Sequence, residues 1–431
     1  MHTHFYAILL LLGRARGVGI GVVLGFLLVF LAPLIVQAQP VAFRFEKSRT
    51  RKVQLPFLLQ RNLIIVPIWL NQKGPYNFIL DTGINTSLIT DPTLRQELNL
   101  SVGGQFLVAG AGEENPLEAF HIPSVAVSFS QGVAAPSLNF LMLSEDVLNL
   151  SGYVGMPIHG LLGADVFRSF VVEVNPVTET LIFRDPATFK APRGKRWARL
   201  PLDMEGRKSY LTLPVQLNDS LTLPLKLVLD TGAGHALSLE TTSDARLQLP
   251  LQRMRSQLGR GLNGNINGYL GRVAALQLGR YRVPSLLTSF PDAADVAQRA
   301  DVPRNGNLGF ELLKRFTVII DYTYNRLLLR PNEKYRDPFE HDMCGFEVLA
   351  TGPNYRQYRV LRVEPTGPAA QAGIQTGDEI LSINLIPAEV FNLTQLSRML
   401  HSADGRQLLF IVRRAATGDL FTTTVRLKRQ I

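Results

Sequence analysis

The segments FILDTGINTS at 78–87 and LVLDTGAGHALS at 227–238 decide how this chain is interpreted. Each holds an Asp-Thr-Gly tripeptide, beginning at Asp81 and Asp230, directly after an apolar stretch that predicts a β-strand. A chain of this length contains one such tripeptide by accident roughly one time in ten. Two copies, each directly after an apolar strand, are a far more specific signal than one. The carboxylates of Asp81 and Asp230 are therefore the candidate reactive groups.

The two tripeptides lie at equivalent places of an internal repeat. Residues 63–90 and 211–240 each contain a proline-bearing strand, a turn and a second apolar strand that runs into Asp-Thr-Gly. Downstream, 160–186 matches 306–331, and the two pairs of landmarks are separated by 149 and 146 residues. A period this long indicates two lobes rather than a solenoid. Alternating apolar and polar residues predict short antiparallel strands in each lobe, with one short helix near 165–170 and 310–316.

With these motifs, residues 55–331 resemble the aspartic peptidases of the retropepsin and pepsin type. The resemblance implies an all-β, two-lobed, acid-protease-like β-barrel fold with a pseudo-two-fold axis, with lobe 1 at 39–190 and lobe 2 at 191–331. It also implies that Asp81 and Asp230 meet as a catalytic pair. A dimer-only enzyme is disfavoured, because one chain already holds both halves.

The expected chemistry explains the residue types. Two neighbouring carboxylates share one proton, so one can take a proton from water while the other donates to the peptide carbonyl. This reaction needs no metal, no cofactor and no covalent nucleophile, and its substrates are polypeptides. The pseudo-symmetry leaves the acid and base roles of the two aspartates open. Around the pair, we expect hydrogen bonds across the axis from Thr82 and Thr231, and close backbone approach at Gly83 and Gly232.

Two glycine-rich segments, 102–116 and 258–272, are candidate flaps over the substrate. Flexible surface loops would have the same composition. The glycines proposed for the flap role are Gly110, Gly112, Gly264 and Gly268.

The sequence departs from the family pattern beside each tripeptide. Ile84 and Gly234 stand where small or hydroxyl residues are usual, which leaves the pKa values of the pair open. Thr86 and Ser87 are candidates to replace the missing hydroxyl in lobe 1. We expect His235 to be structural or solvent-facing, because a carboxylate pair needs no imidazole.

After a charged linker at 332–342, residues 343–431 resemble a PDZ domain, chiefly through RVLRVEPTGPAAQAGIQTGDEILSIN at 359–384. The expected fold is a small α+β barrel that binds a peptide or protein ligand as an added strand. Gly345 and Phe346 form the expected peptide-binding turn, and Glu347 beside them disfavours a free carboxylate. Internal segments, or packing on the peptidase lobes, are therefore alternatives. The single cysteine, Cys344, is expected to be a buried apolar residue.

The N-terminus has Arg14 and Arg16 before a long apolar stretch. Residues 1–38 predict a signal peptide cleaved after Ala38, with an uncleaved membrane anchor as the alternative. Either would place the chain outside the cytoplasm, in a periplasm or cell envelope. Residues 39–55 are consistent with a short pro-segment, and FRFEKSRTRKVQLPF at 43–57 is equally consistent with a first strand and a basic turn.

The formal net charge is +10. In the sequence the basic residues form no dense run with interleaved aromatics, so no nucleic-acid partner is expected. An anionic envelope surface is compatible with this excess.

These observations predict an exported aspartic endopeptidase, similar to bacterial exported proteins, with a PDZ domain that selects substrates or partners. The alternative is a catalytically silent peptide-binding scaffold of the cell envelope. The presence of both Asp-Thr-Gly motifs argues against the scaffold, because a silent lobe has no chemical need for both carboxylates.

Overall fold

A computed structural model of the chain describes residues 42–108, 112, 116–296 and 302–431. The predicted signal peptide, its cleavage position and Gly110 lie outside these residues. Within the described ranges, no helix is long and apolar enough to cross a membrane. Residues from 41 to the end form one compact unit.

The first repeat forms a nine-stranded sheet in the order β1-β9-β6-β10-β5-β4-β8-β7, with β3 paired to β4. Three short helices accompany it, and α4 coincides with the helix predicted near 165–170. The elements are β1 (Arg44–Phe45), β3 (Leu58–Gln60), β4 (Leu63–Leu70), β5 (Lys73–Leu80), β6 (Ser87–Ile89), α2 (Leu94–Glu97), β7 (Gly104–Val108), β8 (Leu117–Phe129), β9 (Val133–Leu143), α3 (Leu150–Val154), β10 (Gly160–Leu162) and α4 (Asp165–Ser169).

The second repeat forms an eight-stranded sheet in the order β14-β15-β16-β21-β17-β20-β19-β18. Its central strands repeat the first lobe: β21 runs parallel to β16 and antiparallel to β17, as β10 does with β5 and β6. The elements are β14 (Asp203–Glu205), β15 (Lys208–Gln216), β16 (Thr222–Leu229), β17 (Leu237–Leu239), β18 (Arg253–Gly261), β19 (Gly264–Leu278), β20 (Tyr281–Pro291), α5 (Ala293–Val296), β21 (Gly306–Leu308) and α6 (Phe310–Leu313).

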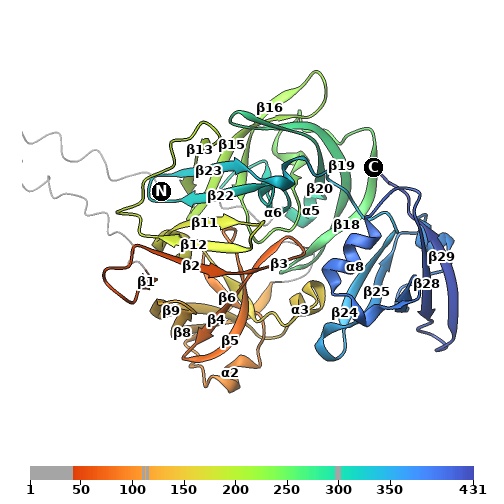
Figure 1. Ribbon diagram of the computed structural model, residues 1–431, viewed down its shortest axis with the longest axis horizontal. Coiled ribbons are helices and arrows are strands. Elements are labelled where there is room, and N and C mark those ends of the chain that lie inside the picture. Colours follow the sequence, from red (N-terminus) through yellow and green to blue (C-terminus); the bar gives the residue numbers. More distant parts are fainter. Residues whose placement is uncertain (1–41, 109–111, 113–115, 297–301) are drawn as a thin grey trace, which may run out of the picture. The chain divides into compact units, whose positions relative to one another are not determined.

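A six-stranded sheet joins the two repeats. Figure 1 shows its strands stacked in the order β13-β23-β22-β11-β12-β2. The edge strand β2 pairs with β12, so residues 43–57 contain a first strand and its basic turn. The strands are β2 (Lys52–Pro56), β11 (Val171–Asn175), β12 (Thr180–Arg184), β13 (Ala198–Pro201), β22 (Phe316–Asp321) and β23 (Arg326–Pro331).

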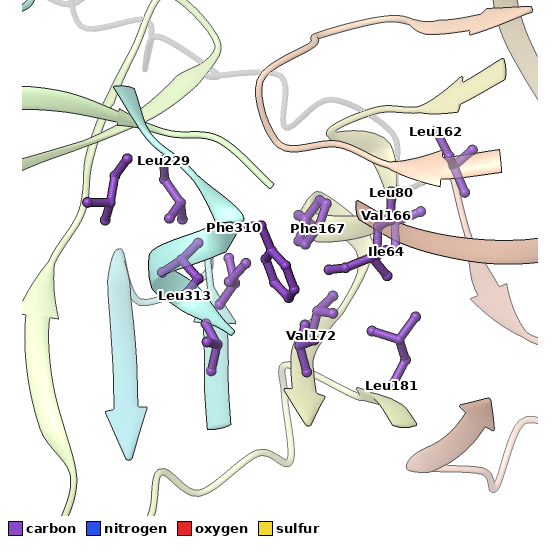
Figure 2. Packing of buried hydrophobic residues seen from close by; sticks show 14 of the residues in the cluster. Ile64, Leu80, Leu162, Val166, Phe167, Val172, Leu181, Leu229, Phe310 and Leu313 are labelled. Carbon is purple, nitrogen blue, oxygen red and sulfur yellow. The ribbon is translucent and has the colours of Figure 1, made fainter. Parts of the chain in front are cut away.

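One large apolar core lies between these three sheets and contains residues of both repeats. Figure 2 shows Leu80 and Phe167 of the first repeat in the same cluster as Leu229 and Phe310 of the second. Leu80 and Leu229 are the residues directly before the two aspartates, and both are fully buried. The core therefore fixes the strand ends from which the candidate site is built.

The C-terminal part has its own sheet, β24-β25-β26-β28-β29 with β27 on β26, and its own apolar core. Cys344 is fully buried in that core, as expected. The helix at Leu393–Leu400 begins with a capping box between Asn392 and Gln395. The elements are β24 (Phe346–Thr351), β25 (Gln357–Val363), α7 (Pro368–Gln371), β26 (Glu379–Ile383), β27 (Ile386–Pro387), α8 (Leu393–Leu400), β28 (Gln407–Arg413) and β29 (Leu420–Arg426).

The predicted linker 332–342 is held against the second repeat. The buried Arg315 donates to the carbonyls of Asp337 and Pro338 at 3.2 and 3.0 Å. Its guanidinium carbon lies 3.6 Å from the centroid of the Phe339 ring. This segment is therefore an ordered strap rather than a freely moving connection. The all-β, two-lobed architecture with a C-terminal α+β domain agrees with the fold class predicted from the sequence.

Candidate active site

The two Asp-Thr-Gly turns begin where β5 and β16 end, and a short parallel strand holds each of them. The backbone N–H of Asp81 donates to the carbonyl of Leu162 in β10 at 2.9 Å. The N–H of Asp230 donates to the carbonyl of Leu308 in β21 at 3.0 Å. The downstream elements of the repeat, 160–163 and 306–309, thus lie beside the turns at equivalent places.

Thr82 and Thr231 connect the two turns. The N–H of Thr82 donates to Oγ1 of Thr231, and the N–H of Thr231 donates to Oγ1 of Thr82, both at 3.0 Å. Each hydroxyl then donates to the other repeat, Thr82 to Leu229 O at 2.7 Å and Thr231 to Leu80 O at 2.9 Å. Both threonines are buried, so this network fixes the register of the two turns.

The two glycines allow the carboxylates to converge. A Cβ atom built on Gly83 would lie 2.7 Å from Asp230 Oδ1 and 3.0 Å from Asp81 Oδ1. A Cβ atom built on Gly232 would lie 2.2 Å from Asp81 Cγ. Both carboxylates therefore occupy one small volume, and a side chain at either glycine would displace one of them.

The surroundings of the two carboxylates differ. Asp81 is 5% exposed, and burial, followed by the charge of Asp230, raises its pKa to about 7. Its Oδ1 accepts the N–H of Gly83 at 2.6 Å. Asp230 accepts the N–H of Gly232 at 3.1 Å and the side-chain amide of Asn307 at 2.8 Å. The pair is thus chemically asymmetric although its backbone is repeated.

Asn307 is a site residue that the sequence reasoning missed. It occupies the second position of β21, where the first repeat has Leu161 in β10. The one sequence feature that could have indicated this role is that β10 and β21 match except at this position, where an amide replaces an apolar residue. Ser87, a candidate to support Asp81, instead accepts the N–H of Gly163 at 3.0 Å through its hydroxyl oxygen.

The two candidate flap hairpins meet each other. Gly112 has φ +119°, and a Cβ atom built there would lie 1.9 Å from the carbonyl oxygen of Asn263. The N–H of Gly112 also donates to Asp295 O at 3.3 Å. Gly264 closes the turn between β18 and β19 with φ +92°, whereas Gly268 pairs within the hairpin. Of the three candidate flap glycines that the structure describes, Gly112 and Gly264 thus lie at the contact, and Gly268 lies further along β19.

An apolar cluster places these hairpins near the first tripeptide. Val108 of β7 and Leu262 of the β18–β19 turn pack in the same cluster as Ile84. Ile84 directly follows Gly83. Its apolar side chain therefore packs in the same apolar cluster as residues of both hairpins. This arrangement gives a packing reason for the departure from the family pattern.

His235 lies in a different environment. Together with Gly234 it lines a cavity of about 740 Å³ whose described lining contains neither Asp81 nor Asp230. Asn62 also lines this cavity, and its side-chain amide donates to Gly234 O at 2.9 Å. The expectation that His235 is structural or solvent-facing stays a prediction.

The same cavity is lined on its other side by the C-terminal domain. Phe346 and Val348 of β24, and Thr394, Ser397 and His401 in or beside α8, contribute to it. β24 is an edge strand of its sheet, the kind of edge to which a peptide can be added as a strand. On this side α3 of the first repeat packs against it. Glu347 forms an ion pair with Arg61 of the first repeat at 3.6 Å.

The expected peptide-binding turn is already filled by a side chain of the chain itself. Asp342 accepts the N–H groups of Cys344, Gly345 and Phe346 at 3.2, 2.5 and 3.1 Å. Burial raises the pKa of Asp342 to about 7, against the opposing effect of these hydrogen bonds. The sequence pointed to Glu347 as the residue that disfavours binding of a free C-terminal carboxylate. The turn is instead occupied by Asp342, which lies in the predicted linker 332–342.

Comparisons with known proteins agree with both parts of the chain. The family described as Aspartyl protease matches residues 66–166 and 213–312, and the family described as PDZ domain matches residues 359–414. A search of curated proteins gave no significant match. One similar solved structure is Basic 7S globulin from soybean, with 12% identity, a TM-score of 0.38, and coverage of 67% of this chain and 97% of that one. The chain therefore carries the two repeats of an aspartyl protease domain followed by a C-terminal PDZ domain.

Proposed function

We propose that this protein is an aspartic endopeptidase in which Asp81 and Asp230 activate a water for attack on a peptide carbonyl. The observation that carries this proposal is the convergence of both carboxylates on one small volume, with Thr82 and Thr231 bonded across the repeats. A purely structural pair of carboxylates would be costly in this setting, because burial and mutual repulsion oppose the ionised form.

The asymmetry of the pair supports an assignment of roles in the free protein. Asp81, with its pKa raised to about 7, holds the shared proton. Asp230 accepts a hydrogen bond from the side-chain amide of Asn307, and we assign it the role of base. In the reaction, water loses a proton to Asp230 as its oxygen bonds to the carbonyl carbon, and the carbonyl oxygen takes the proton of Asp81. The tetrahedral diol then collapses: the C–N bond breaks, the leaving nitrogen takes the proton from Asp230, and a diol hydroxyl returns a proton to Asp81 as the new carboxylic acid forms.

The PDZ domain supports a second part of the proposal, the binding of extended polypeptide segments along β24. Because Asp342 fills the turn, internal segments fit this strand edge better than free C-termini. Export to a periplasm or cell envelope, suggested by the N-terminal sequence, belongs to the same proposal.

The proposal is tested with an unfolded protein mixture, incubated with wild type, Asp81→Asn and Asp230→Asn from roughly pH 3 to pH 8. Asp219→Asn, an exposed aspartate of the second repeat, is the matched control. We expect either active-site change to lower cleavage on the order of a thousandfold, and Asp219→Asn to leave it unchanged. Cleavage that survives in Asp81→Asn or Asp230→Asn rules out the mechanism. Absence of wild-type cleavage at every pH, with retained binding of unfolded protein, favours the scaffold function instead.

A further inference from the structure

Two sequence segments contain the whole excess of positive charge in residues 41–431. Residues 44–52 and 184–199 hold eleven Lys and Arg against two acidic residues, a net charge of +9. The remainder of residues 41–431 holds 32 basic and 33 acidic residues and is nearly neutral. The eleven residues, here called the basic face, are Arg44, Lys47, Arg49, Arg51, Lys52, Arg184, Lys190, Arg193, Lys195, Arg196 and Arg199.

The tertiary structure brings the two segments together. Lys52 of β2 lies opposite Arg184 of β12, and the N–H of Asp185 donates to Arg51 O at 3.0 Å. After β12 the chain crosses from one edge of the six-stranded sheet to β13 at the other edge. Figure 1 shows β2 and β12 adjacent in that sheet and β13 at its far side. Segments more than 130 residues apart in the sequence thus form one surface.

This surface lies on the side of the sheet away from the main core. Phe189, Ala191 and Trp197 of the crossing segment pack on Val171, Ile319 and Leu328. The alternate residues of the same strands, such as Val172 and Ile320, point into the main core instead. A protein docked through the basic face would therefore keep the sheet and the core between its partner and the strand ends that carry Asp81 and Asp230.

The charges of the basic face are available to a partner. Ten of the eleven side chains are exposed, and Arg184 is half-buried. Of the eleven basic-face residues, two form ion pairs with described residues. Arg51 pairs with Asp185 at 3.4 Å, and Arg184 pairs with Glu173 at 2.6 Å. A cavity of about 460 Å³ between them is lined by Arg51, Lys52, Arg184, Lys190, Arg330 and Trp197, among others.

The chemistry of this face favours a fluid anionic surface over a nucleic acid. Binding of single strands relies on exposed aromatic rings that stack on bases. Trp197 is instead half-buried, and Arg330 lies over its ring at 5.0 Å. The exposed cations are spread over loops and strand ends, which suits diffuse attraction to many headgroups.

The position of the basic face in the sequence also points to a lipid surface. The apolar stretch that ends at Val36 precedes Arg44 by eight residues, a span of at most about 28 Å. In the predicted alternative of an uncleaved anchor, the first basic segment would lie close to the membrane that holds this stretch.

We propose that the basic face docks residues 41–431 onto an anionic phospholipid surface, with the carboxylate pair directed away from the lipid. Basic residues near such a surface are attracted to its anionic headgroups, and salt screens this attraction. The docking is independent of the proposed peptidase activity.

The test uses residues 41–431, which form one compact unit, and so removes the apolar stretch as a source of binding. Cosedimentation is measured with vesicles of phosphatidylcholine alone, and with vesicles containing equal parts of phosphatidylcholine and phosphatidylglycerol. We expect binding to the anionic vesicles only, and its loss at high salt. The variant Lys47→Gln, Lys52→Gln, Lys195→Gln, Arg196→Gln should bind on the order of a hundredfold more weakly.

The matched control removes four exposed cations of the PDZ domain, as Arg359→Gln, Arg406→Gln, Arg426→Gln, Lys428→Gln. It should retain most of the binding, and thermal unfolding should show both variants folded. Equal losses in the two variants would mean that only net charge matters and would overturn the proposed face. Equal binding to both kinds of vesicle, or tighter binding to a single-stranded oligonucleotide than to anionic vesicles, would overturn the lipid assignment.

Discussion

Thr82 and Thr231 exchange hydrogen bonds across the two repeats, each N–H donating to the hydroxyl of the other at 3.0 Å. The two turns are therefore one structure rather than two independent loops. Because both residues are buried, water cannot replace a lost partner, and an unpaired donor or acceptor keeps its desolvation cost.

Replacement of Thr82 by valine should lower the free energy of unfolding by about 1–3 kcal/mol. The methyl group fills the space of the hydroxyl but leaves the N–H of Thr231 and the carbonyl of Leu229 unpaired. Thr231→Val should cost a similar amount, and the double variant should lose less than the sum, since both changes remove the same network. Urea unfolding measures these values, with the exposed Thr222→Val as control. A loss no larger than that of the control would contradict the role given to the pair.

The pKa of Asp81 predicts a pH dependence of stability. The folded protein keeps this proton up to about pH 7, whereas the unfolded chain releases it near the ordinary value of 3.8. Between these values the unfolded state binds fewer protons, so the unfolding free energy falls as pH rises, by up to about 1.4 kcal/mol per unit. Asp81→Asn lacks this contribution, so its stability relative to wild type should increase from pH 3.8 to about 7. Thermal unfolding across this window, with Asp219→Asn as reference, checks the sign; a constant difference would refute it.

The same pKa predicts the alkaline limb of the proposed peptidase activity. The acid role of Asp81 requires its proton, so kcat/KM should fall above about pH 7. A pH–rate profile on a soluble peptide substrate measures the limb. Activity that stays constant well above this pH would show that Asp81 does not act as the acid.

Gly112 should be needed for the contact between the hairpins. In Gly112→Val the new side chain meets the backbone of Asn263 and requires a disfavoured φ. We expect kcat/KM to fall by roughly 10- to 100-fold, as small displacements near a reacting group can cause. Gly194→Ala, where the nearest atom to a Cβ lies 3.8 Å away, should leave kinetics unchanged. Unchanged kinetics in Gly112→Val would mean that the hairpins do not act as flaps.

Asp342 should determine which peptide termini the PDZ domain accepts. Asp342→Ala frees the three N–H groups of the turn, and a charged acceptor bonded to them is worth about 1.5–3 kcal/mol. A set of decapeptides with apolar last residues, prepared as free acids and as C-terminal amides, tests this by fluorescence anisotropy. Wild type should bind both forms similarly, and Asp342→Ala should prefer the free acids by roughly tenfold or more.

The control for this experiment is the exposed Asp419→Ala in the same domain, which should behave as wild type. A strong preference of the wild-type protein for free acids would show that ligands displace Asp342 readily, and would contradict its role as a permanent occupant of the turn.

Much of the fold could be predicted because it is encoded locally and then repeated. The strand that ends at Leu80 and the strand that ends at Leu229 are apolar runs cut short by Asp-Thr-Gly, and α8 has its cap and its apolar spacing in adjacent residues. The nearly constant separation of two landmarks then indicated two copies of one unit, and so one site. Each of these features depends only on the order of neighbouring residues within a short segment of the sequence.

Asn307, Asp342 and the basic face could not be predicted in the same way, because their roles depend on pairing between distant segments. Asn307 is a strand residue like Leu161 until the parallel pairing of β21 and β16 sets its amide beside Asp230. The basic face exists only because β2 pairs with β12 across the first repeat. The sequence by itself determined the duplicated lobes, the two aspartates and the PDZ domain. The tertiary structure decided the asymmetry of the pair, the occupant of the PDZ turn and where the positive charge gathers, because burial and charge proximity arise only when the sheets close.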